Sequence, residues 1–279
     1  MFLMSQFKLL FKSKEFALTL AGMIALSVYV FLSFCASLYG ADDVFVLSAD
    51  KTFILRSESN QLSAILPFLL PLVIVIPFAD SYVVDKQYYI LPSIMSRTTG
   101  KNYFFSKMLV VALSAGTVIF IPFAVNILLG LLAFPVKSSN YSLYALSGNQ
   151  SIYYTYYMDN ILFPEMFVKN PYLYNFVFLC LLTVFCMLCA CLIYTISYFI
   201  KNNRILLLSL AFIVNNFIVI FSNAINSIEL SPFAYLIPLN NVRYKPIGFL
   251  FFLFAAIIFF IILLSPACIK KLNDVIEGL

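Results

Sequence analysis

Paired carboxylates are the first residues in this sequence whose type and spacing suggest chemistry. Asp80 and Asp85 lie in one short charged segment, and two aspartates can hold a magnesium ion and, through it, a diphosphate. Such a site needs a second cluster of aspartates, which the sequence lacks. The chain also contains no histidine, which excludes Ser-His and Cys-His nucleophile systems and HExxH metal sites in their usual forms. A GxxxxGKS or GxxxxGKT phosphate loop is absent too, so we expect neither an enzyme nor a chain that itself binds ATP in this way.

Cysteines are the other candidate ligands in this sequence. There are six: Cys35, Cys180, Cys186, Cys189, Cys191 and Cys268. All lie within or at the edge of long apolar runs, where cysteine acts as a small apolar packing residue. Three of them lie close together in the sequence, but at lipid depth and without a histidine they do not match a zinc site. We expect no metal and no cofactor in this chain.

The charged segment, residues 80–107, lies between two apolar runs that carry no charge. Residues 85–91 favour a short helix that Pro92 ends, and a turn at 98–100 precedes a helix that starts near Asn102. The charged residues face water: Asp80, Asp85, Lys86, Arg97, Lys101 and Lys107. This internal structure is typical of a docking surface. The alternative is an ordinary basic loop that only fixes orientation in a membrane.

The composition predicts a membrane protein. With 63% hydrophobic residues, 10% charged residues and a mean hydropathy of +1.00, the chain has more apolar side chains than a water-soluble domain of its length can bury. Six windows approach or exceed the roughly 20 residues of a spanning helix: about 16–38, 62–79, 108–134, 172–200, 205–227 and 247–268. We therefore predict an all-α polytopic membrane protein, a single transmembrane domain of six helices over residues 1–279.

The second window is the shortest of the six. It contains Pro67, Pro71 and Pro77. Proline removes a backbone donor and clashes with the preceding turn, so we expect this helix to be kinked, and its end can continue as helix past Asp80.

Lysine and arginine set the orientation, because basic residues near the ends of spans stay on the cytoplasmic side. With the N-terminus inside, 11 of the 17 basic residues are cytoplasmic: Lys8, Lys12, Lys14, Lys86, Arg97, Lys101, Lys107, Lys201, Arg204, Lys270 and Lys271. The opposite side keeps Lys51, Arg56, Lys137, Lys169, Arg243 and Lys245. We expect both termini in the cytoplasm, and we attribute the net charge of +5 to membrane orientation rather than to nucleic-acid binding.

The N-terminal residues 1–15 predict an amphipathic helix in the interface of the cytoplasmic leaflet. One helical face carries Leu3, Phe7, Leu10 and Phe11, and the opposite face carries Ser5, Lys8 and Lys12. A frayed basic terminus is the alternative, because the segment is short.

The connections on the outer side differ in character. The first, at about 39–61, is small and mildly acidic. The second, at about 135–171, is rich in tyrosine, which prefers the membrane boundary, so we expect it along the outer interface. In the last connection the apolar piece PFAYLIPL is too short to span, and it predicts a re-entrant or interfacial element.

Residues 201–204 are all that join the fourth and fifth windows, so we expect these two helices to pack as a tight antiparallel hairpin. The fifth window carries a polar stripe: Ser209, Asn215, Asn216, Asn223 and Asn226. Amides at membrane depth need partners. These amides either hold helices or subunits together, which we favour, or line a transport path.

The order of residues in the charged segment resembles that of the membrane subunit of ABC-2 type ATP-binding-cassette transporters. In that family an acidic residue, a short helix and a serine-arginine pair precede the third span, an order matched here by Asp85, Tyr88 to Leu91, Ser96-Arg97 and Lys107. An aspartate stands where the family usually has glutamate, and the piece before the sixth span is short. The predicted topology resembles the family over nearly the whole chain.

The resemblance implies the permease subunit of a bacterial exporter in the plasma membrane. It makes residues 80–107 the coupling loop, which docks in a groove of a separate cytoplasmic ATPase subunit that holds ATP and magnesium. The residues it assigns to this contact are Asp85, Tyr88, Tyr89, Leu91, Ser96 and Arg97. It also implies a second permease, as a homodimer or a related chain, since one six-helix half cannot enclose a path. Substrates in the family include peptides, drugs, lipids and polysaccharides.

Two other classes of protein remain open. A channel or secondary carrier needs charges within the spans or broken helices in matching halves, and the six windows contain no charge and no clear repeat. A membrane scaffold or immunity protein that does not transport fits the composition equally well.

Overall fold

The structure is a computed structural model, and it describes residues 2–40, 48–55, 61–136, 162–200, 203–225, 231–236 and 247–277. Within these ranges the regular elements are all helices, with no strand. Five helices are long and apolar enough to cross a membrane: α2 (Lys14–Ser37), α6 (Gly100–Ala133), α10 (Pro171–Ser197), α11 (Arg204–Ala224) and α13 (Ile247–Glu277). The predicted all-α class is confirmed, and the five apolar helices fit a membrane protein.

The second predicted window forms a shorter helix, α3 (Gln61–Val75), with Pro67 and Pro71 inside it. The helix does not continue past Asp80, contrary to the expectation. Residues 76–80 form turns before a new helix, α4 (Ser81–Gln87), begins. The physical reason is Pro77, which has no N–H to donate to the preceding turn and so favours an end to the helix just before it.

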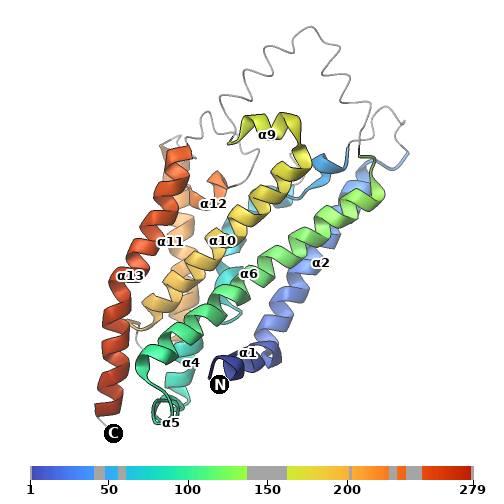
Figure 1. The fold of residues 1–279 in the computed structure, drawn as a ribbon. Helices are drawn as coiled ribbons and strands as arrows, with labels where there is room; N and C mark the ends of the chain where they lie inside the picture. Colours follow the sequence, from blue (N-terminus) through green and yellow to red (C-terminus); the bar gives the residue numbers. More distant parts are fainter. Residues whose placement is uncertain are drawn as a thin grey trace.

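Both chain termini lie at one end of the bundle (Figure 1), which we call the terminal end. The N-terminal helix α1 (Phe2–Lys12) and the short helices α4 and α5 (Leu91–Met95) lie at this end as well. At the opposite end lie the short helices η2 (Ala49–Thr52), α9 (Pro164–Lys169) and α12 (Pro232–Tyr235).

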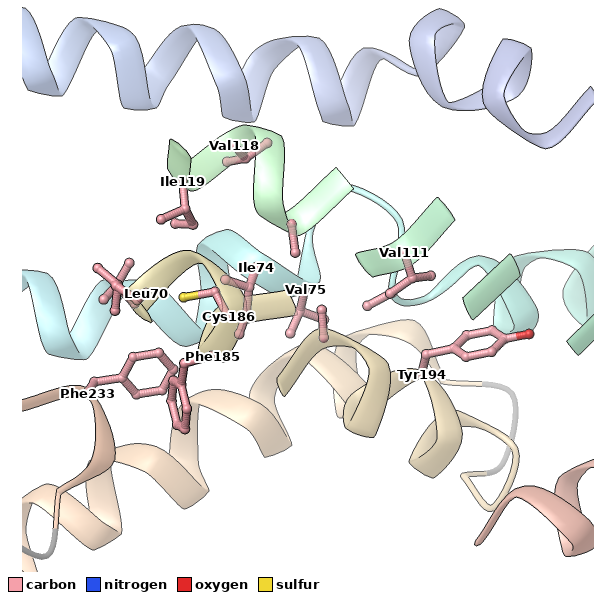
Figure 2. Packing of buried hydrophobic residues seen from close by; sticks show 14 of the residues in the cluster. Leu70, Ile74, Val75, Val111, Val118, Ile119, Phe185, Cys186, Tyr194 and Phe233 are labelled. Atoms are coloured by element: carbon pink, nitrogen blue, oxygen red, sulfur yellow. The ribbon is translucent and has the colours of Figure 1, made fainter. Parts of the chain in front are cut away.

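Helices α6 and α10 form the centre of the bundle and pack along each other. Helix α2 packs on α6, and α13 packs on α10. Helix α3 fills the interior, and Figure 2 shows its side chains interlocked with those of α6, α10 and α12: Leu70, Ile74 and Val75 with Val111, Val118, Ile119, Phe185, Cys186, Tyr194 and Phe233. One continuous core therefore joins the helices.

Helix α11 packs mainly on α3 and touches α10 only slightly, so the expected tight hairpin of the fourth and fifth windows is wrong in its packing. Lys201 and Asn202 of the connection lie outside the described residues. Asn203 is described, and its Oδ1 accepts hydrogen bonds from the amides of Ile205 and Leu206, which cap the start of α11. A short connection determines where α11 starts, but it does not determine which neighbouring helix α11 packs against.

Residues 48–55 of the first connection are buried between the helices, which the sequence did not indicate. Phe53, Ile54 and Leu55 are each at most 1% exposed. Two asparagines hold this segment: Asn126 Oδ1 accepts the amide of Ile54 at 2.9 Å, and Asn175 Nδ2 donates to the carbonyl of Asp50 at 2.8 Å. The tyrosines predicted at the outer interface, from position 141 to 157, lie outside the described residues.

The ends of the chain differ in part from expectation. Helix α1 is present, but the predicted apolar face is divided: Leu10 is buried in the bundle, whereas Phe11 stays exposed, as does Met4. The apolar piece PFAYLIPL before α13 begins with the short helix α12. Its Phe233 is buried against Phe185, with ring centroids 5.2 Å apart. Residues 237–246 lie outside the described residues.

Candidate functional site: a docking surface at the terminal end

The charged segment folds as two short helices joined by a tight turn. Helix α4 ends at Gln87, and Tyr89 then adopts a left-handed backbone with φ of 55°. The amide of Ile90 donates to the carbonyl of Asp85 at 3.0 Å, which closes the turn. Left-handed φ values cost a residue with a side chain about 1 kcal/mol or more, so the surroundings must hold this turn in place.

The boundaries of these helices differ from the sequence expectation. Residues 85–91 do not form one helix that Pro92 ends; instead Pro92 lies in the first turn of α5. The first turn of a helix is where proline is best tolerated, because its missing N–H would have had no partner there. Helix α6 starts at Gly100, where Thr99 caps it by accepting the amide of Asn102, so residues 100–107 of the predicted loop belong to a long helix.

Asp85 is bonded inside the protein rather than presented on its surface. Its Oδ2 accepts a hydrogen bond from the Tyr103 hydroxyl at 2.6 Å. The same oxygen forms an ion pair with Lys107 Nζ at 2.5 Å. Lys107 is 2% exposed and also donates to the carbonyl of Ser81 at 3.1 Å. These bonds tie α4 to α6, because a buried ammonium is stable only with its acceptors in place.

Arg204 forms a second link at the start of α11. It makes an ion pair with Asp80, which precedes α4, and a second pair with Glu15 of α2 at 3.5 Å. Burial raises the pKa of the Asp80 carboxyl, and the Arg204 guanidinium opposes that rise. One guanidinium therefore connects three segments that lie far apart in the sequence.

Aromatic stacking provides a third link, from α4 to α10. The rings of Tyr82 and Tyr198 stack with centroids 3.8 Å apart, and the hydroxyls of Tyr194 and Tyr198 lie 2.6 Å from each other. Burial raises the pKa of the Tyr82 hydroxyl above its ordinary value. Stacked rings with bonded hydroxyls resist sliding, which fixes α4 on the end of α10.

The C-terminal end of α13 supports the same segment. Helix α13 continues to Glu277 and packs on α5, with Leu272 fully buried and with Leu91 and Met95 at most 4% exposed. A Cβ at Gly100 would lie 2.6 Å from Asn273 Oδ1, so the chain approaches too closely there for any other residue without movement. The predicted cytoplasmic tail thus continues α13 as far as Glu277, with Leu272 as its buried contact among the described side chains.

The surface that remains exposed is the turn itself. The exposed fractions are 71% for Tyr88, 87% for Tyr89 and 45% for Ile90. The side chains of Lys86, Ser96, Arg97 and Lys101 around them are exposed as well. We call this set, Lys86, Tyr88, Tyr89, Ile90, Ser96, Arg97 and Lys101, the docking surface.

Most residues that the sequence assigned to partner contact lie where a partner can reach them, but two do not. Leu91 is 3% exposed and packs inside, and Asp85 is bonded to Lys107 and Tyr103. Sequence reasoning missed Lys107 as the partner of Asp85. The available signal was the spacing of its neighbours. Lys107 lies four residues, about one helical turn, after Tyr103, so both side chains share a helix face and can contact the same carboxylate.

The polar stripe of α11 divides into a packing residue and one of open role. Asn215 Nδ2 donates at 3.0 Å to the carbonyl of Pro67, whose usual donor would be the N–H that Pro71 lacks. Asn216 Oδ1 is buried without a partner among the described residues. Asn223 lies in α11, but its side chain is outside the description, and Asn226 falls outside the described residues.

Among the described residues no group of three or more cysteines, aspartates and glutamates could hold a metal ion, and all six cysteines are free thiols. Comparisons of this chain with models of protein families, with curated proteins and with solved structures find no match.

Proposed function

We propose that this chain is the membrane subunit of an ABC-2 type ATP-binding-cassette exporter in a bacterial plasma membrane. In this proposal a separate cytoplasmic ATPase binds ATP and magnesium and docks on residues 80–100, and this chain supplies half of the substrate path. A second permease, identical or related, supplies the other half.

The observation that carries the proposal is the exposed aromatic turn at Tyr88 and Tyr89. Large apolar side chains that are exposed in water and held on a strained, well-anchored backbone are unusual unless they bind something. Tyrosine is among the residues that dominate protein interfaces. The turn lies at the terminal end, beside the last turns of α13, where a soluble partner can reach it (Figure 1).

The links around the turn support a coupling role. Helix α4 is tied to α6 by Asp85, to α10 by Tyr82, and through the preceding Asp80 to Arg204 of α11. A partner that moved α4 would therefore act on three long helices at once, which is what an ATP-driven change between inward and outward access requires.

The remaining parts of the proposal follow the charge distribution. The terminal end faces the cytoplasm, α3 with the turns after it completes a sixth crossing, and α1 lies in the inner interface with Met4 and Phe11 toward lipid. Helices α11 and α13 leave long apolar faces for lipid or for a second subunit.

Purification with bound partners tests the proposal. The tagged chain, extracted from its own host in mild detergent, should retain a soluble protein with ATPase activity. Arg97→Glu and Tyr89→Asn should lower the amount of retained ATPase by about tenfold or more, the effect of losing one central contact of about 2 kcal/mol. Asparagine is chosen because it tolerates a left-handed backbone, so only the ring is lost.

The matched control is Lys14→Glu, which reverses an exposed charge at the terminal end but outside the docking surface. Equal ATPase retention by all three variants would reduce this segment to an orienting basic loop. A wild-type protein that is folded but carries no ATPase would instead favour the membrane scaffold or immunity protein.

A further inference from the structure

The described acidic side chains at the terminal end are mostly in ion pairs. Asp80 and Glu15 pair with Arg204, and Asp85 pairs with Lys107. Asp274, four residues after Lys270, is the only other acidic residue at this end whose side chain the structure describes, and it is exposed. Exposed cations therefore outnumber exposed, unpaired carboxylates at the described part of the terminal end.

The exposed cations surround the aromatic turn. Lys86 precedes it, and Arg97 and Lys101 follow it. Lys101 adjoins Gly100, which meets Asn273 of α13, so the last turns of α13 lie beside the docking surface. Lys270 on these turns is exposed and extends the basic area.

We infer that the partner of the docking surface offers an apolar groove with an acidic rim, and that the last turns of α13 form one side of the surface it binds. The groove takes Tyr88, Tyr89 and Ile90 with Arg97 as a central contact, and the rim faces Lys101 and Lys270. Rim charges of this kind guide the partners together and fix their orientation more than they add affinity. This inference rests on the proposed function and names the chemistry of its partner.

A membrane surface is the other anionic ligand that a basic surface can attract, and the geometry disfavours it. A surface that binds lipid headgroups lies along the side of a bundle, at the level where the apolar faces end. The turn between α4 and α5 instead lies at the end of the bundle (Figure 1). At that position the apolar residues of the turn are open to a soluble protein rather than to the membrane surface.

Charge reversal tests the rim. Lys101→Glu and Lys270→Glu should each lower the retained ATPase by about three- to tenfold at low salt, and the loss should shrink at about 0.5 M NaCl because screening weakens rim contacts. Lys14→Glu is the control. If Lys101→Glu and Lys270→Glu bind like the control while Arg97→Glu does not, the acidic rim and the role of α13 are refuted and the proposed function stands.

Thiol labelling tests the same surface without any reference to ATPase activity. In a variant without native cysteines, Ser96→Cys is treated with a maleimide in open membrane fragments from the host, before and after a high-salt wash. An acidic soluble partner should protect the thiol until the wash removes it, while Lys14→Cys should label equally in both. Unchanged labelling of Ser96→Cys refutes the inference even where the ATPase is retained through other contacts.

Purified protein in vesicles separates the two anionic ligands. Ser96→Cys should label equally fast in vesicles of phosphatidylglycerol and of phosphatidylcholine if its ligand is a protein. Slower labelling in phosphatidylglycerol alone would show that the basic surface binds lipid, and the inference would be wrong. If no ATPase is retained by the wild type but salt-sensitive protection is found, the proposed function fails while the chemistry of the partner holds.

Discussion

Single asparagines in this protein complete backbone hydrogen bonds that the sequence leaves open. Asn215 supplies the donor that Pro71 cannot, and Asn126 accepts the amide of Ile54 while its Nδ2 donates to the carbonyl of Ser27. An unpaired backbone group in a low-dielectric interior is costly, so one amide side chain can decide whether a neighbouring segment stays in place.

Leucine substitutions should separate the packing amide of α11 from its neighbour. Asn215→Leu should lower stability by about 0.6–2 kcal/mol, because the Pro67 carbonyl loses its donor. Asn216→Leu should leave stability unchanged or raise it, because Asn216 Oδ1 has no partner among the described residues. Thermal unfolding in detergent measures both. An equal loss of stability in the two variants would show that the hydrogen bond from Asn215 to Pro67 does not contribute measurably to stability.

A stable Asn216→Leu variant that loses transport or dimer content would place Asn216 on the path or at a second subunit. This outcome would assign the part of the polar stripe that packing does not explain.

At the scale of elements, α4 is the helix on which the proposed coupling depends, although it has only 7 residues. A helix this short does not persist alone in water, so its position depends on its contacts. Asp85 supplies one of these by its pair with the buried Lys107. Breaking one side of a buried pair leaves an uncompensated charge, whereas removing both sides does not.

A double-mutant cycle tests this link. Asp85→Asn should destabilise the protein by about 3 kcal/mol, because Lys107 is left buried without its counter-ion. The double variant Asp85→Asn with Lys107→Met should recover most of that loss. Lys86→Met, at an exposed position next to Asp85, is the control and should change little. Additive losses in urea or thermal unfolding would mean that the pair does not couple α4 to α6.

At the scale of the whole molecule, both termini lie at one end of the bundle (Figure 1), and five described helices are long and apolar enough to cross a membrane. In the proposed topology α3 with the turns after it supplies the sixth crossing. The proline-broken second window is therefore compatible with a crossing made of a short helix and turns, sheltered by α6, α10 and α11.

Thiol labelling of intact cells tests the orientation. In a variant without native cysteines, Asn149→Cys and Ser57→Cys should react with an impermeant reagent from outside, and Thr99→Cys should react only after the cells are opened. The lysine and arginine distribution gives this direction. Labelling of Thr99→Cys in intact cells would overturn both the orientation and the proposed cytoplasmic partner.

The sequence by itself determined the apolar helices and the accessible part of the candidate site. Long runs without charge can only be buried or in lipid, so five of the six windows appear as long helices. Most of their boundaries lie near those predicted, but α6 begins eight residues before its window and α13 ends nine residues after its window. Of the aromatic and basic residues between them, Tyr88, Tyr89 and Arg97 are exposed as expected, whereas Lys107 is buried. These features follow from composition and local pattern, which need no knowledge of neighbours.

Tertiary structure alone decided which residues of the charged segment are bonded inside. Asp85 and Leu91 look as available as Arg97 in the sequence, but Lys107 and α13 take them into the interior. The same holds for the packing of α11 on α3 and the burial of residues 48–55, both fixed by asparagines that meet carbonyls or amides far along the chain. Such pairings depend on which helices lie side by side, and helix periodicity shows only which face of a helix is apolar, not which helix covers it.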